Sequence, residues 1–258
     1  MDTLLERDRT VVAAALGLLV VLAWLYLWRL AGAMAEMARH MGMPDMHPWS
    51  VADALLLCVM WAVMMVAMML PSAAPMILVF AATDRRRTTA RVRPLTRTGI
   101  FVLGYLVIWS LFSGIVAAAQ WGLHRAALLS PGMVSTSPLL GGALLVAAGV
   151  FQWTPLKRAC LLRCRSPLSF LMAEWRGGRR GAFIMGLRHG AVCIGCCWLL
   201  MGLLFVAGVM NLVWVAVIAV FVLAEKVIPR GDQLGRVAGA VLLAAGLVMI
   251  ASGWRPAL

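Results

Sequence analysis

The chain alternates between long apolar stretches and short polar or basic connections. Seven stretches approach the roughly 20 residues that a helix needs to cross a bilayer. They lie at 11–31, 51–80, 98–121, 138–156, 182–209, 211–229 and 237–254. This pattern predicts an all-α, polytopic transmembrane bundle of about seven spans. We expect one integral membrane domain over residues 1–258, and we expect the lipid bilayer to be one of its partners.

Three places in this pattern are irregular. The second stretch is too long for one crossing and contains Pro71 and Pro75, so we expect it to break or kink near Pro71. The fifth and sixth stretches are divided only by residues 208–211, which predicts a tight turn at the membrane surface. The first stretch is favoured as a span over a signal peptide, because its apolar region is about twice as long as a signal peptide needs.

Charge adds an orientation to these spans. The chain is 63% hydrophobic and 13% charged, which excludes a soluble enzyme, a secreted disulfide scaffold and a disordered tail. Most of the 23 Lys and Arg residues lie in the N-terminal segment and in the second, fourth and sixth connections. The positive-inside rule therefore predicts a cytoplasmic N-terminus and an extracytoplasmic C-terminus. The net charge of +13 is explained by topology, so we expect no nucleic-acid partner.

Methionine is the unusual feature of the composition, with 18 residues. One group lies in the first connection, 32–50, which we expect to be an extracytoplasmic Met/His loop. Thioether and imidazole together suit Cu(I), and imidazole with a carboxylate suits Cu(II) or Zn(II). The alternative is an interfacial helix whose methionines dip into lipid. The candidate ligands of this loop are His40, Met41, Met43, Met46 and His47.

A second group of methionines runs along the second span. Its members recur every four residues, with two more displaced by one position, so they line one side of a helix. This spacing is similar to the Met-x-x-x-Met pattern of copper transporters, although a methionine stripe also serves simple core packing. The group consists of Met60, Met64, Met65, Met68 and Met69.

The third group lies on the fifth span and contains His189, Cys193, Cys196 and Cys197. On a helix these side chains occupy an arc of roughly 100°, beside Arg188. Ionisable groups at this depth are costly and usually functional, which favours a metal or redox site over packing. Four ligands from one helix cannot surround an ion tetrahedrally, so a second helix or a dimer partner must complete the shell. Met64 and Met68 are the best candidates, if the second and fifth spans touch.

A fourth group is the pair Cys160 and Cys164 in the basic cytoplasmic connection. Their spacing places two thiols one helical turn apart, and neighbouring arginines favour thiolates. An accidental spacing of two cysteines without any function is an equally weighted alternative. No cysteine lies in an expected extracytoplasmic loop, so the six cysteines do not predict a disulfide framework.

Two further polar residues, Gln152 and Glu225, lie near the inner ends of the fourth and sixth spans. Adjacent helical residues point about 100° apart, so Glu225 need not pair with Lys226, and Arg188 is a candidate partner. A structural ion pair is favoured for Glu225, with a metal ligand or a proton-relay carboxylate as the alternative.

Several of these motifs together resemble an uncharacterised bacterial family of predicted metal-binding integral membrane proteins. The resemblance covers residues 50–250, which leaves out the Met/His loop. It implies a place in the bacterial inner membrane and adds Gln152, Lys157 and Glu225 as motif positions. The segments that carry it are 64–72, 151–157 with Cys160 and Cys164, 190–201, 211–214 and 225–226.

The preferred hypothesis is the handling of a soft metal, with Cu(I) first and zinc second. The protein would transport the ion or deliver it, with a metallochaperone or a cuproenzyme as partner. Two alternatives are a membrane thiol-disulfide electron conduit and a structural subunit of a larger complex, and a homo-oligomer is also compatible. No nucleotide-binding or hydrolytic motif is present, which favours these classes over an enzyme.

Overall fold

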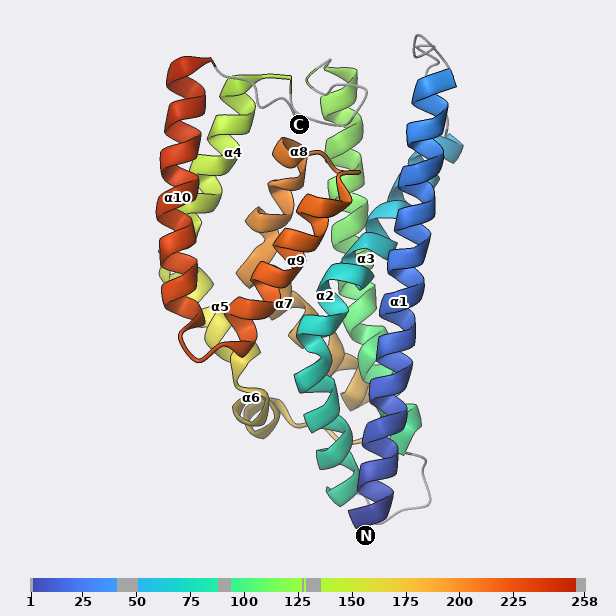
Figure 1. Cartoon of the computed structure of the whole chain (residues 1–258). Coiled ribbons are helices and arrows are strands. Elements are labelled where there is room, and N and C mark those ends of the chain that lie inside the picture. The colour runs from blue at the N-terminus through green and yellow to red at the C-terminus, as the bar shows by residue number, and fades with distance from the viewer. Residues whose placement is uncertain (1, 41–50, 88–93, 127, 129–135, 254–258) are drawn as a thin grey trace.

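The computed structural model describes residues 2–40, 51–87, 94–126, 128 and 136–253, and these form an all-α bundle of ten helices (Figure 1). The helices are α1 (Asp2–His40), α2 (Val51–Arg87), α3 (Pro94–Arg125), α4 (Pro138–Phe151), α5 (Pro155–Arg165), α6 (Pro167–Glu174), α7 (Gly178–Gly202), α8 (Leu204–Ala207), α9 (Leu212–Val227) and α10 (Gly231–Ser252).

Five of these helices are long and apolar enough to cross a membrane: α1, α2, α3, α7 together with α8, and α10. A sixth candidate is formed by α4 and α5, which meet at a bend of 65°. Helix α9 has 16 residues and is shorter than the roughly 20 that a bilayer requires. The all-helical, membrane-compatible class is thus confirmed for the described residues, whereas a total of seven spans and the orientation of the termini stay predictions.

Helix boundaries differ from the sequence expectations in three places. Helix α1 continues to His40, so the first part of the expected Met/His loop is helical. Helix α2 is unbroken through Pro71 and Pro75, although it changes direction along its length in Figure 1. The expected fourth span ends at Phe151, because Gln152 caps α4 and the next helix starts with Pro155 at a new angle.

Two ion pairs join α1 to α2 and α2 to α3. Arg85 at the end of α2 lies 2.6 Å from Asp8 of α1, and Arg97 of α3 lies 3.0 Å from Asp84. These pairs lie toward the lower end of the bundle in Figure 1, in the half that also contains α6 and the start of α7. The charged end of the molecule is therefore built from segments far apart in the sequence.

Glycines bring α3 and α7 into close contact, as the Gly186-x-x-x-Gly190 spacing predicts. A Cβ on Gly186 would overlap the carbonyl oxygen of Phe101, and one on Gly190 would come within 3.2 Å of the carbonyl oxygen of Tyr105. The approach places Tyr105 beside the cysteines of α7. Helices α4 and α10 form a second such pair, which lies beside α9 at the edge of the bundle (Figure 1).

Candidate metal centre

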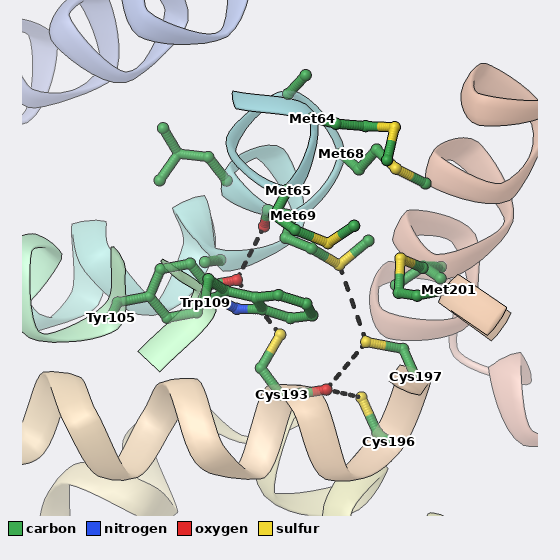
Figure 2. Close-up of a cluster of buried hydrophobic side chains, with 14 of the residues drawn as sticks. Met64, Met65, Met68, Met69, Tyr105, Trp109, Cys193, Cys196, Cys197 and Met201 are labelled. Atoms are coloured by element: carbon green, nitrogen blue, oxygen red, sulfur yellow. Dashed lines mark hydrogen bonds between the residues drawn. The ribbon is translucent and has the colours of Figure 1, made fainter. Parts of the chain in front are cut away.

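Sulfur-containing side chains fill the centre of the bundle. All five methionines of the α2 stripe are buried, at 4% exposure or less, and so are Met201 and the three cysteines of α7. Figure 2 shows Cys197 turned toward Met69, with Met201 nearby, and Cys193 turned toward Tyr105. The α2 stripe therefore faces the protein interior and not lipid.

The two sulfur groups meet where Cys197 lies beside Met69. The thiol of Cys197 lies 3.8 Å from Met69 Sδ and also donates to the carbonyl oxygen of Cys193 at 3.0 Å. Cys196 donates to the same carbonyl oxygen at 3.1 Å. Met64 and Met68 were the methionines expected to complete the α7 site, but the methionine that contacts Cys197 is Met69.

Tyr105 connects the two helices that carry these sulfurs. Its hydroxyl lies 3.2 Å from the carbonyl oxygen of Met69, to which it donates, and 3.3 Å from Cys193 Sγ. Ser72 also donates to the Met69 carbonyl, at 2.9 Å. Side chains from α2 and α3 thus both donate to the Met69 carbonyl oxygen and join this turn of α2 to α3.

Lys226 of α9 brings a positive charge to the same point. Its ammonium group donates to Cys193 Sγ at 3.0 Å and to Ser72 Oγ at 2.8 Å, and the residue is buried. A buried ammonium ion needs a compensating negative charge. Cys193 is the acceptor that can provide one, as a thiolate, which is also the form of cysteine that binds metal.

His189 lies one turn from Cys193 in an aromatic cage. Its ring packs against Phe101, Tyr105 and Phe170, with ring centroids 5.6 to 6.1 Å apart. Its Nδ1 atom is buried and has no hydrogen-bond partner within the described part of the chain. Among those residues, no three His, Cys, Asp or Glu side chains converge closely enough to hold a metal ion. The predicted His/Cys arc is therefore not assembled as a ligand set by itself.

The fourth predicted group joins the same cluster. Cys164 of α5 is buried and interacts with the thiols of Cys193 and Cys196. Cys160, one turn earlier, is half-buried and interacts with Cys196. Helices α5 and α7, which carry the fourth and third predicted groups, are thus in contact.

A second polar cluster lies between α4, α5 and α9. Lys157 donates to both carboxylate oxygens of Glu225, at 2.7 and 2.9 Å, and to the side-chain oxygen of Gln152. All three residues are buried and line a cavity of about 170 Å³. Glu225 therefore forms a structural ion pair, as the sequence favoured, and its partner is Lys157. The suggested pairing of Glu225 with Arg188 is wrong, because Arg188 is partly exposed and pairs with Glu174 of α6.

The first predicted ligand group cannot be compared with these sites. Met41, Met43, Met46 and His47 lie outside the described residues, and of His40 only the backbone is described, at the end of α1. Tyr105, Ser72 and Met201 are site residues that sequence reasoning missed. Lys226 was considered only as a neighbour of Glu225. These four residues belong to the site because of contacts between helices, and the spacing of residues along one helix does not indicate such contacts.

The donor set of the centre fits a soft, monovalent ion. Two thiols and a thioether from two helices are ligands that Cu(I) prefers. Among the residues that the structure describes, the centre contains no carboxylate ligand of the kind that harder ions favour. The molecule is thus a helical bundle with membrane-length helices around a buried thiol and thioether centre.

Comparison with known proteins is consistent with this donor set. The model of the PpoB2 family, described as copper chaperone, matches residues 58–249, and the chain belongs to that family. The matched region contains the α2 methionines, all cysteines and the Gln152, Lys157 and Glu225 cluster, and it begins after the Met/His segment. No curated protein and no solved structure gives a match.

Proposed function

We propose that this protein is an integral copper chaperone of the bacterial inner membrane. It binds Cu(I) as cargo at Cys193, Cys197 and Met69 and delivers it to a copper-dependent partner protein. The juxtaposition of Cys197 on α7 with Met69 on α2, at 3.8 Å, is the observation that carries this proposal. It brings soft ligands from two helices to one point, which a single helix cannot do.

Charge balance supports Cu(I) over Zn(II). Two thiolates, at Cys193 and Cys197, offset the Lys226 ammonium group and one monovalent cation. A divalent ion in the same place leaves one uncompensated positive charge in a buried site, which is costly. Zinc also favours four ligands in tetrahedral geometry, whereas this centre offers fewer.

The arrangement also suggests how the ion reaches the centre. The methionines of α2 extend from Met60 toward Met69, away from the end of the bundle where α1 finishes and α2 begins. In the proposed orientation this end is extracytoplasmic, so the stripe offers successive thioethers to an entering ion. The Met/His segment that precedes α2 would then make the first contact with copper.

An anaerobic Cu(I) titration of the full-length protein in detergent tests this function. We expect equimolar binding by the native chain and a loss of binding in Cys193→Ser and Cys197→Ser. Cys58→Ser is the matched control, because Cys58 is a half-buried α2 cysteine remote from the centre. Equal binding in all four proteins would refute the ligand assignment. Tighter binding of Zn(II) than of Cu(I) by the native chain would refute Cu(I) as the cargo.

Thiol-disulfide exchange is the second candidate function, supported by the contact of Cys164 with Cys193 and Cys196. Alkylation trapping in cells separates the two functions. A copper chaperone keeps these cysteines as thiols during both oxidising and reducing growth. An electron conduit shows a disulfide between α5 and α7 that depends on growth conditions.

A further inference from the structure

The contact between α5 and α7 suggests a route by which cargo leaves the centre. We propose that Cys164 and Cys160 are transfer ligands that carry Cu(I) from Cys193 toward the surface of α5. This inference rests on the proposed function and adds an exit to it. The ion passes from sulfur to sulfur without leaving soft ligands.

The first step of this route is Cys193 to Cys164. Cys164 is 8% exposed and interacts with both Cys193 and Cys196, so it reaches the centre from a helix other than α2 or α7. In the exchange, the bond between copper and Cys193 sulfur breaks as the bond to Cys164 sulfur forms. The bonds to Met69 and Cys197 then break as the bond to Cys160 sulfur forms, and the Cys160 proton passes to Cys197. The thiol proton of Cys164 passes to Cys193, and copper stays Cu(I).

The second step runs from Cys164 to Cys160. The two residues are four apart on α5, so their side chains lie on one face about 5–6 Å apart. Gly195 makes room for Cys160 against α7, because a Cβ at Gly195 would lie 2.8 Å from Cys160 Sγ. The absence of a side chain at Gly195 thus allows Cys160 to approach Cys196.

A groove opens about one helical turn from Cys160. Arg163, which follows Cys160 by one turn, and Val192, which precedes Gly195 by one turn, line an open groove of about 530 Å³. Cys160 is half-buried, whereas Cys193, Cys196 and Cys197 are 2% exposed or less. Exposure therefore rises from the centre to Cys164 and then to Cys160, as an outward path requires.

Helix α5 is held firmly in this position. Thr154 caps its first turn, Lys157 pairs with Glu225, and Arg165 at its end donates to the carbonyl oxygens of Ile228 and Pro229 at 2.7 and 2.6 Å. These anchors lie at both ends of the helix and leave the face that carries the two cysteines against α7. The Lys157 and Glu225 pair thereby positions the transfer ligands.

A transfer experiment on the full-length protein tests the route. The protein is loaded with equimolar Cu(I) in detergent without oxygen, and release to excess bathocuproine disulfonate is followed by stopped-flow absorbance. We expect Cys160→Ser and Cys164→Ser to keep equimolar binding but to release copper about tenfold more slowly, equivalent to about 1.4 kcal/mol of barrier. Cys58→Ser is expected to release at the native rate.

Two further variants keep the test decisive if the serine variants fold poorly. Gly195→Ala keeps every cysteine but displaces Cys160, and it should slow release in the same way. Cys160→Met restores a soft ligand and should recover much of the rate. Native release rates in Cys160→Ser and Gly195→Ala would overturn the proposed route while leaving the copper centre intact. Loss of binding in the native chain would instead overturn the proposed function.

Discussion

The thiol of Cys197 on α7 lies 3.8 Å from the thioether sulfur of Met69 on α2, although 128 positions separate the two residues. Neither helix by itself presents enough converging ligands for an ion. Their meeting depends on Tyr105 of α3, which lies 3.2 Å from the Met69 carbonyl oxygen and 3.3 Å from Cys193 Sγ. The candidate centre is therefore a product of three helices in contact.

Substitution of Met69 by Leu should weaken copper binding without unfolding the protein. Leu has nearly the volume of Met, so the change in stability should stay below about 1.5 kcal/mol. The soft ligand is lost, and we expect Cu(I) affinity to fall about tenfold or more in competition with bathocuproine disulfonate. Met172→Leu is the control, because Met172 is 74% exposed on α6. Equal affinities for both variants would assign Met69 to packing alone.

Substitution of Lys226 by Met should change metal selectivity. Removal of the ammonium group leaves two thiolates to be balanced by the ion, so a divalent cation becomes better compensated. We expect the ratio of Zn(II) to Cu(I) affinity to rise about tenfold, measured by competition titration with both metals. Ser72→Ala is the matched control, because it removes one hydrogen bond to Lys226 but keeps the charge. An unchanged ratio in Lys226→Met contradicts the charge-balance argument.

The buried pair of Lys157 and Glu225 should matter most when only one partner is removed. Glu225→Gln leaves the ammonium group of Lys157 without its counter-charge, at a cost of about 3–5 kcal/mol. The double variant Lys157→Met with Glu225→Leu should recover most of this loss in thermal unfolding. Glu174→Gln serves as control, because its pair with Arg188 is partly exposed and is worth about 0–1 kcal/mol. Additive effects of the two core substitutions would rule out a coupled pair.

The glycine contact between α3 and α7 should control both stability and the copper centre. A Cβ at Gly186 would overlap the Phe101 carbonyl oxygen, so Gly186→Ala must push the two helices apart. We expect lower thermal stability and weaker Cu(I) binding together, since Tyr105 moves with α3. The control is Gly114→Ala on α3. A Cβ at Gly114 meets nothing within 4 Å, so this change should be neutral or stabilising by about 0.5–1 kcal/mol. A neutral Gly186→Ala would show that the helices have room to adjust.

Local features of the fold followed from the sequence because they depend on neighbours along the chain. Apolar length predicted the membrane-compatible helices, and helical spacing predicted that the α2 methionines share one side of their helix. Helix ends were less well predicted. Helix α1 runs to His40 through polar residues, and the bend of 65° after Phe151 divides an apolar stretch that looked continuous. Average hydrophobicity does not register such changes of direction.

The sequence by itself determined which helix faces carry sulfur, because a rotation of 100° per residue places Met60, Met64 and Met68 on one side and Cys193 and Cys197 on another. It also determined that this sulfur belongs to a copper-handling family. Only the tertiary structure decided which groups meet. Met69 contacts Cys197, Lys226 pairs with Cys193, and Lys157 pairs with Glu225. These pairings depend on how helices cross and how closely glycines let them approach, and contacts between segments so distant in the chain leave no periodic signal.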